Sequence, residues 1–477
     1  MPRETAITGG MEASTAAESH EAAVWAVQEF GDARLGNVKR TERLVSMAGA
    51  VMERPGGRIT SVFQTTRELE GAYRFVENEH VDHCEVGAAA WRACARRSRG
   101  LTFAFVPIDG CSLTLKDATG SKGYGPVGTS KDEAMGVRSI NAVGLSPEGV
   151  PLGMAGQVLW TRSRQGTKKH RTERAFHEKE TANWLRVMEQ VNRVFDEEGG
   201  ALRWFQVDAE GDFRELLDWA EQTKQLVTVR AGQDRRLVDA GGRLLWETMQ
   251  ATPVCGEYSL RVRGNKHRKA RTANIVVRHR EVQLQPLHAH QGDRPTITLH
   301  AVLAQEAGTT PEGEKPIEWL LLTNFYVSSF DDAILVVHGY TQRWRVEEFH
   351  KAWQSVCEVE DSQLHFCNFV VWATILSSVA MKIETMKYLS REEPDTPATE
   401  LFSEYEIEAA ALILQPKDYE EGATHTVGQV VRWIADIGGY TGKSSGGPPG
   451  TIVLSRGWSR VEPAAIAVRR IRERGKT

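Results

Sequence analysis

The sequence predicts an α/β fold in which a mixed sheet lies between two helical ends. Residues 23–85 carry a helical pattern of apolar residues. From about residue 101, short apolar strands are separated by one crossover helix, and a helical pattern returns from Asp331. Strands followed by a crossover helix and a further strand are typical of a mixed α/β sheet.

The first 85 residues divide into a polar lead and a helical segment. Residues 1–22 contain several glutamates among small residues, a pattern of neither a signal peptide nor a transit peptide, and we predict a disordered lead. In the helical segment 23–85, Lys39 and Arg43 are four residues apart, so both lie on one helical face with Arg40 beside them.

Residues 86–390 are expected to hold the sheet. The predicted strands are 101–106, 137–145, 151–160 and 202–207, with a helix at about 177–197; a β-rich insertion at about 225–325 adds 226–229, 275–277, 297–303 and 319–323. Helices are predicted from Asp331 to about residue 388, followed by a linker at 391–397. Residues 391–477 form the predicted helical C-terminal domain.

Composition indicates an ordinary soluble protein. The chain has 477 residues, 41% hydrophobic and 26% charged, which suffices for two to four domains. No run of about 18 apolar residues is apparent, so we expect no membrane span. The six cysteines show no zinc-like spacing and are expected to be reduced, in a bacterial cytoplasmic, nucleoid-associated protein.

Basic residues are clustered although the net charge is −4. The clusters are Arg261, Arg263, Lys266, Arg268, Lys269, Arg271, Arg278 and Arg280; Arg162, Arg164, Lys168, Lys169, Arg171 and Arg174; and Arg469, Arg470, Arg472, Arg474 and Lys476. Any one of them could be a solvated face. Three on an acidic background favour a polyanionic partner, because screening lets each basic face act locally.

Three acids are candidates for a metal site. Asp109 and Asp208 each come just past the predicted end of an apolar strand, and Glu347 lies in a predicted helix. A single strand-end aspartate is usually a turn or helix-capping residue. Three carboxylates together suit Mg²⁺ or Mn²⁺, and a pair of such ions can activate and stabilise the two oxygens of a phosphodiester displacement.

The segment from Tyr340 to Trp353 strengthens this interpretation. On one continuous helix, Arg343, Glu347 and Lys351 fall at about 300°, 340° and 20° relative to Tyr340. A surface helix with Glu–Lys pairs would explain Glu347 and Lys351 but not the whole face. A metal-dependent phosphate site would use all four side chains.

These motifs resemble the transposon-five type transposases of the insertion-sequence-four family. The likeness rests on YTQRWRVEEFHKAW around Glu347, LGNVKRTERL (35–44), EGAYRF (70–75), DAEGD (208–212) and EWLLLT (318–323). It implies a ribonuclease-H-like catalytic core with the β-rich insertion before the glutamate, and a metal-binding triad of Asp109, Asp208 and Glu347.

The resemblance also implies roles in DNA binding. Tyr340 and Arg343 would hold backbone phosphates, and Trp319 would stack on a base that is flipped out as the transposon end passes through a hairpin intermediate. On spacing alone, Trp319 would be a half-buried strand aromatic. The residues expected to contact the terminal inverted repeat are Lys39, Arg40, Arg43 and Arg74, and the enzyme would act on double-stranded DNA as a homodimer in a synaptic complex, with its C-terminal helices in the dimer contact.

One position departs from the family pattern. A lysine of the motif is replaced by Gln354, and we expect Lys351, one helical turn closer to Glu347, to take over part of its phosphate contact. Two alternatives to an active transposase remain: a DNA-binding regulator of transposition that has lost activity, and a structure-selective nuclease without strand transfer.

Overall fold

The computed structural model describes residues 20–128, 134–163, 173–262, 270–284, 296–442 and 448–474. Most of the predicted lead, residues 1–22, lies outside these ranges.

Helices form the N-terminal part, as the apolar pattern of residues 23–85 predicts. They are α1 (His20–Phe30), α2 (Val38–Glu53), α3 (Ile59–Val62), α4 (Thr66–Val76) and α5 (His83–Arg97). Side-chain caps begin three of them: Asn37 for α2, a capping box of Thr65 with Glu68 for α4, and Asp82 for α5. The last helix continues beyond residue 85 and packs against the sheet.

The described strands form one sheet. They are β1 (Phe103–Thr114), β2 (Gly125–Pro126), β3 (Met135–Leu145), β4 (Pro151–Trp160), β5 (Leu202–Val207), β6 (Leu226–Arg230), β7 (Gly256–Val262), β8 (Arg271–Leu284), β9 (Ile297–Glu306) and β10 (Glu318–Thr323). Their order is β2-β3-β1-β5-β6-β10-β9-β8-β7, with β4 paired to β3. Strands β1, β3 and β4 are antiparallel neighbours, whereas β5 and β6 run parallel to β1.

Two helices connect the strands of the central region. The predicted crossover helix is α6 (Ala182–Glu198), which packs on β3 and β4, and α7 (Arg214–Thr223) joins β5 to β6. The amphipathic pattern of α6 buries residues such as Val187, Val191 and Phe195.

The β-rich insertion is an extension of the same sheet. Strand β10 pairs antiparallel with β6, and β9, β8 and β7 follow. The helix α8 (Leu245–Ala251) packs on β8 and β9. The predicted strand 275–277 is too short, since β8 runs from Arg271 to Leu284. Buried residues alternate with more exposed, often charged residues along β8, so it contains no long apolar run.

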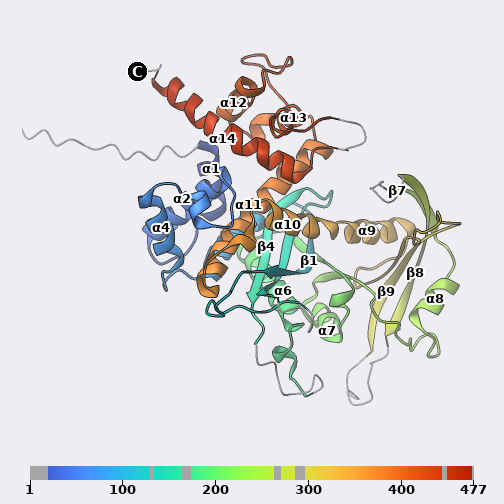
Figure 1. Cartoon of the computed structure of the whole chain (residues 1–477). Helices are drawn as coiled ribbons and strands as arrows, with labels where there is room; N and C mark the ends of the chain where they lie inside the picture. Colours follow the sequence, from blue (N-terminus) through green and yellow to red (C-terminus); the bar gives the residue numbers. More distant parts are fainter. Residues whose placement is uncertain are drawn as a thin grey trace, which may run out of the picture.

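Helices make up the C-terminal third. They are α9 (Phe330–Thr341), α10 (Trp344–Ser355), α11 (Phe366–Glu392), α12 (Glu404–Leu414), α13 (Val427–Ile437) and α14 (Thr451–Arg474). Figure 1 places the N-terminal helices to the left of the sheet, β7–β9 to the right and α12–α14 above it. Gly339 lets α9 cross β1 closely, since a Cβ there would lie 2.5 Å from the Phe105 ring.

The helix α11 corrects one expectation. By length and composition Phe366–Glu392 could cross a membrane, with a mean hydropathy of 1.6 in its most apolar window, so a long apolar run does exist. However, 78% of that window is buried inside the protein. The helix packs against α2, α5, α10 and β4, which is the position of a core helix.

Candidate active site and nucleic-acid interface

The register of β1 and β5 places the two aspartates side by side. The parallel pairing runs through Ile108 and Val207, so the next residues, Asp109 and Asp208, are level with each other. Asp208 follows β5 as predicted and caps a short 3-10 helix, where its Oδ1 accepts a hydrogen bond from the backbone N of Glu210 at 2.8 Å. The prediction that Asp109 ends a strand is wrong: β1 continues beyond it, because β3 still pairs with β1 where β5 has ended.

The third acid reaches this edge of the sheet from α10. Arg343 forms ion pairs with both Asp109 and Glu347: its Nη1 lies 3.3 Å from Asp109 Oδ2, and its Nη2 lies 2.5 Å from Glu347 Oε1. The three side chains are 14%, 16% and 32% exposed for Arg343, Asp109 and Glu347. The ion pairs are therefore partly shielded from water.

The predicted single helix from Tyr340 to Trp353 is two helices. Between α9 and α10 the backbone N of Arg343 bonds to the carbonyl of Tyr340, and that of Val346 bonds to Arg343. These are the i to i−3 bonds of a tighter turn, and the helix-forming residues there give no sequence signal for it. Tyr340, Arg343 and Glu347 still come together, whereas Lys351 is exposed one turn further along α10.

The acids and Arg343 shift one another's pKa values. Burial raises the pKa of Asp109 to about 7; Arg343 acts against this, while Asp208 and Glu347 raise the pKa further. Burial alone would lower the pKa of Arg343, but Glu347 and Asp109 outweigh it and the pKa is raised. A divalent cation beside Asp109 would lower this pKa, because its positive charge favours the ionised carboxylate.

Two aromatic side chains, Tyr340 and Trp319, lie beside the acids. Tyr340 is 6% exposed, and its ring lies 6.1 Å from that of the half-buried Trp319 in an edge-to-face arrangement. Burial raises the pKa of the Tyr340 hydroxyl, while Arg343 and Arg230 lower it through charge and hydrogen bonding. No sequence pattern singles out Arg230, which ends β6 and is level with Asp208 only through the pairing of β5 with β6.

Gln354 does not replace the charge of the family lysine. It lies on α10, where its Nε2 is 3.5 Å from the carbonyl of Ser112 at the far end of β1. The backbone carbonyl of Lys351 accepts from Ser355, and its ammonium is on the exposed side of the helix.

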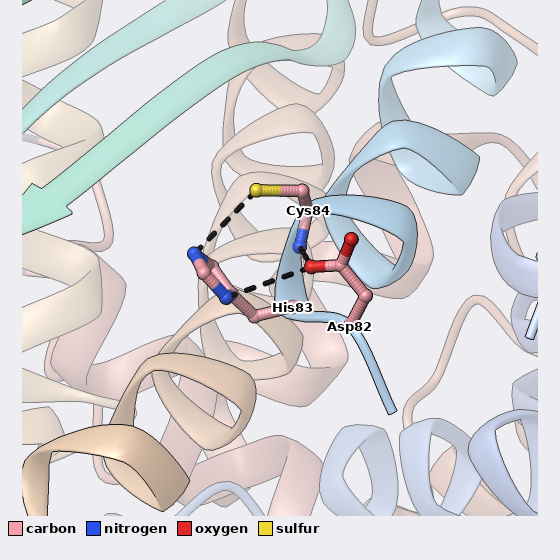
Figure 2. A group of neighbouring side chains, drawn as sticks. All are labelled: Asp82, His83 and Cys84. Carbon is pink, nitrogen blue, oxygen red and sulfur yellow. Dashed lines mark hydrogen bonds and ion pairs between the residues drawn. The ribbon is translucent and has the colours of Figure 1, made fainter. Parts of the chain in front are cut away.

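A second group of potential metal ligands lies at the start of α5. Among the described residues, only Asp82, His83 and Cys84 offer three ligand atoms within 4.8 Å of one another. Figure 2 shows that His83 turns Nδ1 toward Asp82 (3.8 Å) and Nε2 toward Cys84 (3.6 Å), while Asp82 Oδ1 accepts a hydrogen bond from the backbone N of Cys84 (2.8 Å). Burial raises the pKa of the Cys84 thiol to about 11, and Asp82 already caps the helix. We interpret this group as a helix cap.

The three acids predicted to bind metal are further apart than that group. Asp109, Asp208 and Glu347 do not all lie within 4.8 Å of one another, because the Arg343 guanidinium stands between the first and the third. Their oxygen atoms nevertheless fit Mg²⁺ or Mn²⁺, which prefer carboxylates.

The N-terminal helices carry a basic cleft of about 360 Å³ between α2 and α4. The basic residues that line it are Lys39, Arg40, Arg43, Arg67 and Arg74, so all four predicted contacts are brought together and Arg67 is added. Lys39 and Arg74 pair with the exposed Glu42 and Glu70, and Arg40 donates to the carbonyl of Leu35.

In each of the three basic clusters identified from the sequence, some residues form ion pairs within the protein. In the first, Arg271 pairs with Glu306 and Glu314, Arg280 pairs with Asp239, and Arg278 donates to the carbonyl of Thr252, so these serve the insertion itself. In the second, Arg162 pairs with Glu180 in a cleft of about 730 Å³ that Arg174, Lys179 and Arg186 also line. In the third, Arg472 pairs with Glu408. The cluster members outside the described residues are Arg164, Lys168, Lys169, Arg171, Arg263, Lys266, Arg268, Lys269 and Lys476.

Residues 22–81 match the family model described as transposase DNA-binding. The matched segment comprises α1 to α4 and therefore the whole basic cleft. A chain with this domain binds DNA, and the match supports a DNA-binding transposase.

Proposed function

We propose that this protein is a cut-and-paste DNA transposase of the transposon-five type. It would bind the terminal inverted repeats, cleave the ends by metal-dependent phosphoryl transfer through a hairpin intermediate, and insert the element into target DNA. The observation that carries the proposal is the meeting of Asp109, Asp208 and Glu347, from two parallel strands and a helix, at one edge of the sheet beside Arg343.

The topology supports a ribonuclease-H-like core. The meander of β1, β3 and β4 is followed by β5 and β6 parallel to β1, which gives the order β4-β3-β1-β5-β6. The strands β7–β10 then extend this sheet before the chain reaches Glu347. This is the placement that the family resemblance implies.

In the proposed site, Asp109, Asp208 and Glu347 would hold two Mg²⁺ ions, with Mn²⁺ as a substitute. Bound ions would activate the attacking oxygen and stabilise the leaving one. Arg343 would neutralise phosphate charge beside the acids. Lys351 would add a more distant positive charge.

Trp319 and Tyr340 would contact the DNA end. Trp319 offers the exposed part of a π-face to a flipped base, and stacking recovers about 1–3 kcal/mol of the cost of unstacking. Tyr340 packs behind it and supports its orientation. Its hydroxyl would complete a phosphate contact together with Arg343.

The end-binding role of the basic cleft can be tested at Arg43. Its guanidinium forms no hydrogen bond or ion pair with the residues that the structure describes, and the group lies over Gly71. Arg43→Ala should weaken binding to candidate ends and reduce the salt slope of log K by about 1. A matched change at Arg271, which is paired internally, should leave the slope unchanged.

The catalytic proposal is tested by incubating the protein with Mg²⁺ and DNA that carries the inverted repeats flanking its gene. Hairpin-ended excised product is expected, and Asp109→Ala should abolish it while specific binding persists. Binding without any cleavage by the wild type would refute the proposal. The synaptic homodimer, with contacts from the C-terminal helices, predicts that two ends are held in one complex.

A catalytically inactive regulator of transposition is the second candidate. Gln354, which supplies no charge where the family has a lysine, is the observation that favours it. A regulator would bind ends and inhibit an active enzyme in trans, and it would show no Mg²⁺-dependent cleavage.

A further inference from the structure

A chain of buried polar side chains crosses the protein at the level of the acids. His350 Nε2 lies 3.0 Å from Asn141 Nδ2, Asn141 Oδ1 accepts from Gln157 Nε2 at 2.8 Å, and Gln157 Oε1 accepts from Thr374 Oγ1 at 3.2 Å. All four side chains belong to buried residues. The chain therefore connects α10, β3, β4 and α11 through the core.

This chain of polar side chains lies next to the acids, because Asn141 is on the strand beside Asp109. Asn141 is the cross-strand partner of Asp109 on one side and of Gln157 on the other. His350 stands three residues after Glu347 on α10, nearly one helical turn away. One hydrogen bond thus joins the strand residue opposite the first acid to the helix that carries the third.

The bond constrains α10 more than its apolar contacts do. Val346 and Phe349 are fully buried on α10, and the hydrophobic contacts of such side chains have no preferred direction. A buried amide and imidazole lose about 1–3 kcal/mol if either is left unpaired, so they fix the rotation and position of the helix. Burial lowers the pKa of His350 to about 4, and the ring stays neutral beside Arg343.

We propose that Asn141 and His350 are positioning residues that set the separation of Glu347 from Asp109. The inference rests on the proposed function, because the separation matters only if the two carboxylates share metal ions. Without the bond, α10 would keep its fold and its apolar contacts. Glu347 would be displaced relative to the strand, and metal affinity would fall.

The chain offers a matched pair of variants. In His350→Gln the amide end stands where Nε2 was, so Asn141 keeps its partner. In His350→Asn the shorter amide resembles the Nδ1 side of the ring and cannot reach Asn141. The control is Thr228→Val, which removes a buried bond to Trp204 (2.9 Å) in the same sheet without touching α10.

The measurement is Mn²⁺ binding to the full-length, DNA-free protein, followed by the EPR signal of free Mn²⁺ alongside thermal unfolding. We expect His350→Asn to weaken Mn²⁺ binding about tenfold, the size of effect found for outer-shell partners, with His350→Gln within about twofold of wild type. Thr228→Val should bind like the wild type.

Asp109→Asn distinguishes a failure of the proposed metal site from a failure of the positioning role. If it binds Mn²⁺ as well as the wild type does, the proposed metal site and with it the proposed function fail. If Asp109→Asn loses binding but His350→Asn and His350→Gln behave alike, the proposed function stands and the positioning role is overturned. A tenfold loss in Thr228→Val would also overturn it, because general destabilisation would then explain the effect.

Discussion

Replacing Asp109 by asparagine should stabilise the protein while it removes the proposed activity. The side chain is only 16% exposed and lies next to Asp208 and Glu347. An asparagine has nearly the same shape and can still accept the hydrogen bond from the backbone N of Gly110, which is 2.9 Å long. The variant therefore removes a buried negative charge together with its ion pair to Arg343, and the raised pKa of Asp109 already includes the favourable effect of that pair.

The magnitude follows from the pKa of Asp109, which burial raises from 3.8 to about 7. At 1.36 kcal/mol per unit, a shift of about three units corresponds to about 4 kcal/mol. The folded protein binds the extra proton between these two values, so the wild type loses stability as pH rises from about 4 to about 7. The asparagine variant should be more stable by up to about 4 kcal/mol near pH 8 and by less than about 1 kcal/mol near pH 4.

Thermal and urea unfolding at the two pH values, with and without Mg²⁺, would measure this difference. Mg²⁺ should stabilise the wild type near pH 8 by binding the folded state and should have little effect on Asp109→Asn. Asp361→Asn is a control at an acid whose side chain is 48% exposed, and it should change stability by less than about 0.5 kcal/mol. If Asp109→Asn is no more stable than the wild type near pH 8, the inference that the three acids strain the metal-free protein is wrong.

Three further substitutions test other parts of the structure. Gly57→Ala would place a Cβ 1.8 Å from the carbonyl oxygen of Glu358, whereas Gly450→Ala meets no atom within 4 Å; calorimetry should show a loss of about 1–3 kcal/mol for the first and none for the second. Trp319→Ala should reduce hairpin formation by about 5- to 150-fold, as expected from losing one base stack, and Trp319→Phe should retain most of it; an equal loss in both would exclude stacking. Gln354→Lys should raise the rate of end cleavage by restoring a positive charge near the phosphate, and an unchanged rate would show that this charge is not limiting.

Local pattern was sufficient for most of the secondary structure. The strand 202–207 is found with the predicted bounds, and the strands at 137–145 and 151–160 differ by at most two residues. Apolar runs bounded by turn residues give such strands a clear signal. Where charged residues share a strand, as in β8 (Arg271–Leu284), the signal was lost and the prediction covered three residues of the strand.

The candidate site was predicted residue by residue but not in its arrangement. The local motif around Tyr340 identified Glu347 and Arg343. The helix-forming residues around the turn between α9 and α10 gave no signal for that turn. The continuation of β1 beyond Asp109 depends on pairing with β3, which lies about 30 residues further along the chain. Basic residues such as Arg271 were counted toward a DNA surface, although they are neutralised by acids that are distant in sequence.

The sequence by itself determined which side chains are available: three carboxylates, a cluster of cations before residue 81, and an aromatic beside the proposed site. Only the tertiary structure decided that Asp109 and Asp208 are level, that Arg343 bridges Asp109 to Glu347, and that the polar chain ending at His350 holds the helix in place. Hydrophobic periodicity reports which face of an element is buried, because burial depends on the element's own residues. Strand register, ion pairing and buried hydrogen bonds depend on partners far away in sequence, so they are settled only when the elements pack together.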